Sequence, residues 1–336
     1  MPIVNIVILL YSFANDFTRK TGGYMTTNSM KLQENKLAAA QKKLENAKKE
    51  YFETIESIQA FAEPRLVQSA SLIVRAAYSD RVAWMMAVMA KLAYIEFETS
   101  EDELFRLIFN LKSGGFELVS TFSKGSTQGF LAKNENMYVL AFRGTQPKRY
   151  EDINTDIRVY KNTLKEGKIH AGFSEAYQEV EDEIVNIFLK NQEWTWPLYV
   201  TGHSLGGALA TIATQNLEHK IKSQIAACYT FGSPRVGNRQ YERNTKAPFY
   251  RIVHSTDIVT LVPSIGYMHI GDPRYLTYSK SESDKFYLYR SIPTFRRFWE
   301  MLLAIIIPFN WPRWVMCHSI DEYERKLRIY AIERNK

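Results

Sequence analysis

The sequence predicts an α/β fold with a mostly parallel central sheet and helices on both of its faces. Strand and helix signals alternate through Thr201, Tyr229 and the run Tyr250–Val253, and such alternation is typical of a parallel sheet covered by helices. The pentapeptide at 202–206, Gly-His-Ser-Leu-Gly, lies between a strand signal and a helix signal. A chain of 336 residues is long enough for one large domain of this class and an extension.

The composition is that of an ordinary soluble globular protein, with 46% hydrophobic and 24% charged residues. The two cysteines, Cys228 and Cys317, both lie in apolar surroundings, which argues against a disulfide scaffold. The net charge is +7, but no nucleic-acid-binding module accompanies it, so we expect no nucleic-acid partner. No metal-ligand cluster or nucleotide loop is visible, and we expect neither a metal nor a cofactor.

We expect residues 1–65 to form an N-terminal apolar segment with a helical extension, and residues 66–336 to form the α/β domain. Residues 31–61 contain no Gly or Pro, and their apolar residues recur at spacings of three and four, which predicts a helix with one narrow apolar stripe. Pro64 then ends this helix, so we place the domain boundary there.

The apolar run at residues 1–14 has no basic residue before it, unlike a cleavable signal peptide. It is also shorter than the roughly 20 residues that span a bilayer. We therefore expect a cytoplasmic or peripheral-membrane protein. Met1 and Met25 are both compatible with a translation start.

The elements around the pentapeptide can be placed from their composition. Residues 66–97 are rich in Ala, Val, Met and Ile and predict one or two buried helices. Three strands are expected at 116–122, 127–133 and 137–142. The run at 196–201 predicts a strand that enters the pentapeptide, and 207–217 a helix that leaves it.

Ser204, at the centre of the pentapeptide, is the candidate nucleophile. A strand, a tight turn flanked by glycines and a helix are the context of a nucleophile elbow. Gly202 and Gly206 lack the Cβ atoms that would clash where strand and helix meet, and His203 and Leu205 complete the turn. The hydroxyl then lies beside a helix N-terminus, which favours a developing negative charge.

A nucleophilic serine needs a base that a third group holds in place. After an elbow serine, the expected chain order is an acid and then a histidine. Asp257 follows the strand that ends at His254 and is the candidate acid. Asp272 and Asp284 compete with it, but neither follows a strong strand signal.

His318 is the candidate base, because it stands where a loop meets the final helix and a loop can place an imidazole over a serine. His219 and His254 precede Asp257 and break the expected order. His269 lies in a turn-rich stretch and is an alternative with a structural role.

Two backbone amides should hold the oxyanion. One is the N–H of Leu205, directly after the nucleophile. The other is the N–H of Thr145, because the strand that ends near Phe142 runs into a glycine turn at Gly144.

From about Ala77 to Tyr323, the chain resembles the class 3 lipases, the fungal-lipase-like branch of the α/β-hydrolases. The resemblance rests on an oxyanion strand, an H-x-G-F segment, the elbow, a strand and loop after the elbow helix, and segments with the acid and the histidine. In chain order these are Ala141–Thr145, His170–Tyr177, Gly202–Gly207, Phe231–Asn238, Val253–Val259 and Cys317–Tyr323.

The resemblance implies an α/β-hydrolase fold, a triad of Ser204, Asp257 and His318, supporting roles for His254 and His269, and hydrolysis of lipid esters. Triacylglycerol lipase and phospholipase A1 both stay open: the basic charge favours anionic membrane lipids, and the family favours neutral glycerides. The alternative from another class is a lipase-like scaffold that serves as a membrane or protein interaction module.

An apolar segment with aromatic and basic flanks, residues 298–314, precedes the candidate base. It is too short to span a membrane. Its pattern suits insertion into one leaflet of an anionic membrane, and a helix packed on the core is the equal alternative.

Overall fold

The computed structural model describes residues 77–145, 164–165, 169–190, 196–221, 224–243, 245–254, 257–263, 266–278, 286–291 and 317–334, together with Lys42. The segment 298–314 lies outside these residues. So do the predicted domain boundary near residue 65 and, apart from Lys42, the predicted helix over 31–61. The expectations for these three parts of the chain therefore stay predictions.

The described residues form an eight-stranded sheet in the order β1-β2-β3-β6-β7-β8-β9-β10. Strands β3, β6, β7, β8 and β9 run parallel to one another. At the edges the pairing is antiparallel, between β1 and β2, between β2 and β3, and between β9 and β10. The prediction of a mostly parallel central sheet is confirmed. The strands are β1 Glu117–Lys124, β2 Thr127–Lys133, β3 Tyr138–Phe142, β6 Leu198–His203, β7 Ile225–Phe231, β8 Phe249–His254, β9 Asp272–Tyr278 and β10 Phe286–Tyr289.

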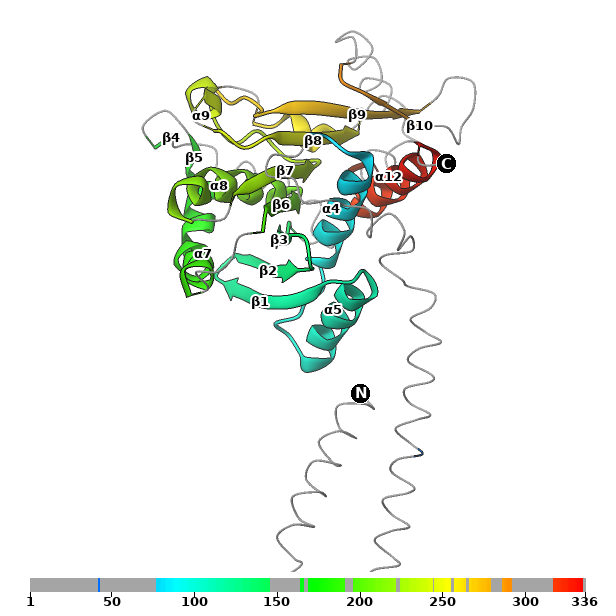
Figure 1. Ribbon diagram of the computed structural model, residues 1–336. Helices are drawn as coiled ribbons and strands as arrows, with labels where there is room; N and C mark the ends of the chain where they lie inside the picture. Colours follow the sequence, from blue (N-terminus) through cyan, green and yellow to red (C-terminus); the bar gives the residue numbers. More distant parts are fainter. Residues whose placement is uncertain are drawn as a thin grey trace, which may run out of the picture.

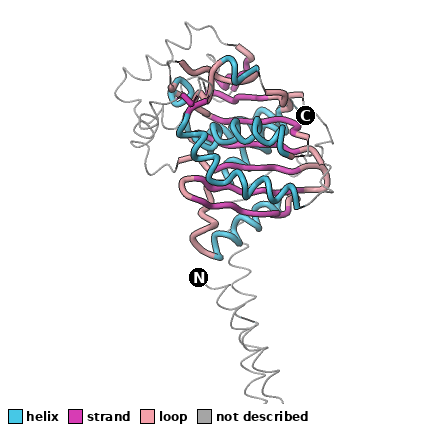
Figure 2. Tube along the Cα trace, turned by 90° about the vertical axis from the view of Figure 1, so that its left-hand side faces the viewer, coloured by secondary structure: helices cyan, strands magenta, loops and turns pink. Residues whose placement is uncertain are grey.

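Helices cover both faces of this sheet (Figures 1 and 2). One face carries α7 (Ala171–Lys190) and α8 (Leu205–Lys220), and the other carries α4 (Asp80–Leu92) and α12 (Ile320–Arg334). The remaining described elements are short or peripheral: α5 Glu101–Ser113, β4 Leu164–Lys165, β5 Ile169–His170, α9 Arg239–Arg243 and the 3-10 turn η2 Ile258–Leu261.

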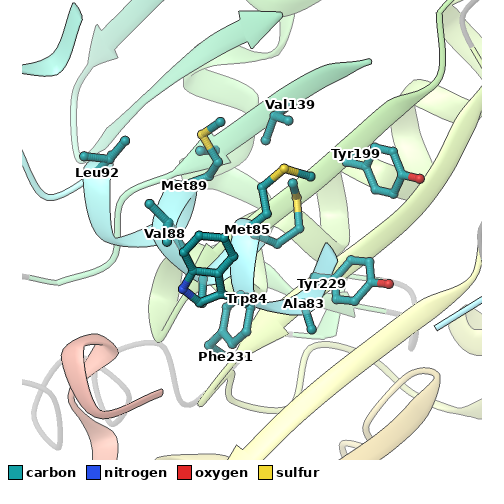
Figure 3. Close-up of a cluster of buried hydrophobic side chains, with 14 of the residues drawn as sticks. Ala83, Trp84, Met85, Val88, Met89, Leu92, Val139, Tyr199, Tyr229 and Phe231 are labelled. Atoms are coloured by element: carbon teal, nitrogen blue, oxygen red, sulfur yellow. The ribbon is translucent and has the colours of Figure 1, made fainter. Parts of the chain in front are cut away.

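The middle of the sheet is buried on both sides, because β3, β6 and β7 are largely apolar and buried along their whole length. All five residues of β3 are buried, and alternate side chains enter different cores: Leu140 joins the α7–α8 side and Val139 the α4 side. Helix α4 fills the second core with Trp84, Met85 and Met89, which lie against the sheet (Figure 3). This helix accounts for the later part of the apolar stretch at 66–97.

The elements around the elbow reach closer to Ser204 than the sequence pattern suggests. Strand β6 continues to His203 and helix α8 begins at Leu205, so a single residue, Ser204, makes the turn. The sequence analysis did not predict α5, β9 or β10. Strand β9 contains Asp272, Pro273 and Arg274, and β10 is only four residues long. Their strand form is defined by the pairing of β9 with β8 and of β10 with β9.

The end of β3 is tied to the turn after α4 by a buried arginine. The Arg143 guanidinium donates to the carbonyl oxygens of Ala93 at 2.6 Å and Ile95 at 2.5 Å. It also binds the Glu98 carboxylate, at 2.8 Å from Oε2. Burial alone would raise the pKa of Glu98, but the hydrogen bonds and charge of Arg143 outweigh it and hold that pKa below its ordinary value. The clamp lies directly before Gly144 and Thr145.

We expect Arg143→Ala to lower the free energy of unfolding by about 3 kcal/mol, because buried carbonyl oxygens and a carboxylate lose their donor. Urea denaturation near neutral pH measures this. The loss should shrink as the pH falls through the lowered pKa of Glu98, since the ion pair then disappears in the parent protein as well.

The matched control is Arg106→Ala, which removes a solvent-exposed arginine paired with Glu103 and should cost less than about 1 kcal/mol. Equal losses for the two substitutions would contradict the assignment of Arg143 as a structural clamp.

Candidate active site

Ser204 forms the whole turn between β6 and α8, with φ of 55° and ψ of −127°. Among the described residues it is the single non-glycine residue with positive φ, a conformation that costs about 1–3 kcal/mol for an L-residue. Its N–H donates to the carbonyl oxygen of Phe231 at 2.9 Å, and its carbonyl accepts from the N–H of Gly207 at 2.9 Å. The strained turn is thus fixed from both sides.

The two glycines of the elbow make this turn sterically feasible. A Cβ atom on Gly202 would lie 2.1 Å from the carbonyl oxygen of Gly206, and one on Gly206 would lie 2.4 Å from the carbonyl oxygen of Phe142. Real Cβ atoms do not approach backbone oxygens this closely. Helix α8 therefore packs against the ends of β6 and β3 because both positions lack a side chain.

The structure brings Ser204, His318 and Asp257 into one hydrogen-bonded series. The Ser204 hydroxyl lies 2.9 Å from His318 Nε2, and His318 Nδ1 lies 2.9 Å from Asp257 Oδ2. All three side chains are buried. Because a carboxylate can only accept, Nδ1 carries the proton and Nε2 is left to accept the serine hydroxyl. This tautomer is the one that a general base toward Ser204 requires.

Asp257 has further donors that the sequence analysis did not anticipate. The hydroxyl of Tyr323 donates to Oδ2 at 2.7 Å, and the N–H of Val259 donates to Oδ1 at 3.0 Å. The Tyr323 oxygen in turn accepts from the N–H of His254 at 2.8 Å. Burial, and then the charge of Asp257, raise the pKa of Tyr323 far above its ordinary value, so this hydroxyl stays a donor. The buried carboxylate is therefore hydrogen-bonded on both oxygens.

Gly232 is a second residue that sequence reasoning missed. It follows β7 with φ of 56°, and a Cβ there would lie 2.6 Å from Asp257 Oδ2 and 3.0 Å from His318 Nδ1. The Asp257–His318 contact thus occupies the space beside this glycine. The sequence motif Phe231–Asn238 includes this glycine, but only the structure shows that it faces Asp257 and His318.

The other histidines weighed from sequence lie away from the serine. His254 Nε2 is bonded to Lys326 Nζ on α12, and His269 Nε2 donates to the carbonyl oxygen of Thr260 at 2.6 Å, in the turn after Asp257. His219 is in the last turn of α8. Of the competing acids, Asp272 forms an ion pair with Arg274 at 2.6 Å, and Asp284 lies outside the described residues.

The candidate oxyanion donors, Leu205 and Thr145, belong to two segments that meet at the serine. Leu205 is the first residue of α8. Thr145 follows Gly144, where a Cβ would lie 3.3 Å from the Cβ of Ser204, so the chain after β3 runs against the nucleophile. Over the described ranges, the structure holds no group of three or more potential metal ligands. No helix in that part of the chain combines the length and apolarity needed to cross a bilayer.

The chain is similar to known lipases in sequence. A family profile described as Lipase (class 3) matches residues 139–267. A lipase of Rhizopus niveus is 36% identical over 172 residues, which cover 46% of this chain and 43% of the relative. The triacylglycerol lipase OBL1 of Arabidopsis thaliana is 30% identical over 203 residues, which cover 44% of this chain and 39% of the relative. The chain thus spans less than half the length of these curated relatives.

Solved structures extend the likeness to the whole fold. Lipase II from Rhizopus niveus superposes with a TM-score of 0.51 at 25% identity, covering 73% of this chain and 94% of that one. MDLA of Penicillium cyclopium gives a TM-score of 0.53 over 74% and 97% of the two chains; at 22% identity it supports the fold alone. Family profile, relatives and fold agree with the expectation from sequence: the chain has the α/β-hydrolase fold, and over residues 139–267 it matches the class 3 lipase family.

Proposed function

We propose that the protein is a serine carboxylester hydrolase that acts on lipid esters. The observation that carries the proposal is the hydrogen-bonded series from Ser204 Oγ through His318 to Asp257, located at an elbow of the family's type. The names of the relatives point to the substrate class: fungal lipases, a plant triacylglycerol lipase and, in Malassezia restricta, a secreted mono- and diacylglycerol lipase.

In the first half of the reaction, Ser204 Oγ attacks the ester carbonyl carbon while His318 Nε2 takes the hydroxyl proton. The charge that develops on the carbonyl oxygen is held by the N–H groups of Leu205 and Thr145. His318 then gives the proton to the leaving alcohol, and an acyl-enzyme on Ser204 remains.

In the second half, water replaces the alcohol. His318 removes a proton from the water as it attacks the acyl carbon, and returns that proton to Ser204 Oγ as the fatty acid leaves. Asp257 keeps the imidazole in the required tautomer and stabilises its charged form. Tyr323 and the N–H of Val259 keep Asp257 itself in place.

A lipase-like scaffold without catalysis is less consistent with this site. The positive φ of Ser204 lowers the stability of the fold. The hydrogen bonds of its backbone maintain this φ, and the absence of side chains at Gly202 and Gly206 leaves room for the turn. Such strain is typical of a functional site. A binding module would gain nothing from it at the residue that contacts His318.

Between the two lipid classes, we propose neutral glycerides as the main substrate, in line with the name of the plant relative. Hydrolysis of phospholipid at the sn-1 ester, which the net charge of +7 favours, is the second candidate. The same experiment distinguishes the two.

The test is incubation of the protein with vesicles that contain both triacylglycerol and phospholipid, followed by lipid mass spectrometry, with Ser204→Ala as the control. We expect free fatty acid and diacylglycerol from the parent protein, and a loss of at least about 10³-fold in the variant. Lysophospholipid in place of diacylglycerol would identify a phospholipase. No release above the Ser204→Ala control, on these vesicles and on soluble short-chain esters, would favour the scaffold.

Contact of residues 298–314 with an anionic membrane remains a proposal, supported by their apolar centre and their aromatic and basic flanks. Vesicles with and without anionic phospholipid test it in the same assay. Faster initial hydrolysis on the anionic vesicles at low salt would support the contact, and equal rates would contradict it.

Gly232→Ala should reduce kcat by about 100-fold, because the new Cβ displaces the Asp257–His318 pair and a positioned pair contributes a factor of this size. It should also lower the free energy of unfolding by about 1–2 kcal/mol through strain at positive φ. Steady-state kinetics on a soluble ester and urea denaturation measure the two effects.

Gly115→Ala is the matched control, since Gly115 has φ of 76° and no atom within 4 Å of the added Cβ. It should lose similar stability and keep kcat. If both variants keep kcat, the close packing of Gly232 against the pair has no catalytic importance.

A further inference from the structure

His203 has two buried polar contacts for which the reaction gives no reason. Its Nε2 lies 2.5 Å from the main-chain oxygen of His318, and its Nδ1 lies 2.7 Å from the hydroxyl of Tyr94. The ring comes from the residue before the nucleophile and is 3% exposed. It thus contacts the backbone of the base while Ser204 contacts the side chain of the base.

The acceptors fix the direction of both hydrogen bonds. A main-chain carbonyl can only accept, so His203 Nε2 carries a proton and donates it to His318. In the neutral ring Nδ1 is then an acceptor, and the Tyr94 hydroxyl donates to it. The chain of donors runs from Tyr94 through His203 to the main chain of His318.

Tyr94 connects this chain to the strand that bears the oxyanion donor. A Cβ on Gly144 would lie 2.4 Å from the Tyr94 hydroxyl oxygen and 2.4 Å from the main-chain oxygen of His203. The hydroxyl therefore lies against the residue that directly precedes Thr145. Tyr94 itself is in the turn that Arg143 clamps, between Ala93 and Ile95.

His203 suits a fixed role beside a base that must become charged. Burial, and then the nearby His318, lower the pKa of His203 far below its ordinary value, so the ring stays neutral. The ring centroids of His203 and His318 are 4.6 Å apart. A positive charge on His203 would oppose the charge that His318 gains in the reaction, and the neutral ring avoids this repulsion.

We propose that Tyr94 and His203 are positioning residues, which hold the His318 main chain at a fixed distance from Gly144 and Thr145 through a continuous series of hydrogen bonds. The base, His318, and the second oxyanion donor, Thr145, lie far apart in the sequence, and these two side chains join them. The proposal rests on the proposed hydrolase function and adds a role to residues outside the triad.

The reason such a link matters is the distance dependence of catalysis. The base and the oxyanion donors act on the same tetrahedral centre, and a displacement of about 1 Å between them costs as much as 100-fold in rate. Side chains locked by buried hydrogen bonds keep catalytic groups within the tolerated range. The link therefore acts on kcat far more than on substrate binding.

The test compares His203→Gln with His203→Leu. Glutamine places an N–H donor near the position of Nε2, whereas leucine fills similar space without a donor. On a soluble ester we expect His203→Leu to lower kcat by about 30-fold with KM changed less than about twofold, and His203→Gln to lower kcat by only about threefold. Equal kcat values for the two variants would overturn the proposal, because packing alone would then explain His203.

A second readout needs no substrate. The proton on His318 Nδ1 is buried in its bond to Asp257, and ¹H NMR detects such protons at low field. The signal should persist in His203→Gln and in the parent protein, and shift or broaden in His203→Leu. An unchanged signal in His203→Leu, with the fold intact by circular dichroism, would overturn the positioning role. This measurement also separates failure of the link from failure of the hydrolase proposal, since an inactive protein still gives the signal.

Discussion

The close approach of helix α8 to the ends of β6 and β3 is the constraint on which the rest of the site depends. Gly202 and Gly206 permit this approach, and the short path forces Ser204 into positive φ. The Phe231 carbonyl then holds the serine N–H. Because β3, β6, β7 and β8 run parallel, their carboxyl ends meet at one edge of the sheet, where open α/β sheets place their sites. Ser204, Asp257 and Thr145 each follow the end of a strand at that edge.

The base reaches this edge from the far end of the chain. His318 lies next to α12, which packs against α4 on one face of the sheet. From the same helix, Tyr323 donates to Asp257, and Lys326 contacts His254 at the end of β8. The histidine is therefore held by its side chain, by its own main chain through His203, and by the helix that follows it. Preorganisation of this kind lets buried polar groups act without reorganisation during the reaction.

The sequence was sufficient for the parts of this account that depend on local pattern. The parallel sheet followed from alternating signals, and the elbow followed from two glycines around Ser204 between a strand and a helix. The contacts that hold Asp257 could not be predicted, since Tyr323 and Gly232 show no local sign of what they face. Likewise nothing in the sequence predicts that Arg143 is buried, whereas the structure buries its side chain against the turn after α4. The bonds from Arg143 to Glu98 and from Tyr323 to Asp257 join residues 45 and 66 positions apart, which periodicity does not connect. The expectations for residues 1–65 and 298–314 come from the sequence alone.

The most direct test of the central claim is covalent labelling by a fluorophosphonate probe, which reacts with activated serines, followed by peptide mass spectrometry. We expect the probe mass to appear on the peptide that contains Ser204. The labelling rate should fall by at least about 100-fold in His318→Ala while circular dichroism shows an intact fold. Labelling at another residue, or an equal rate in His318→Ala, would contradict the claim that His318 activates Ser204.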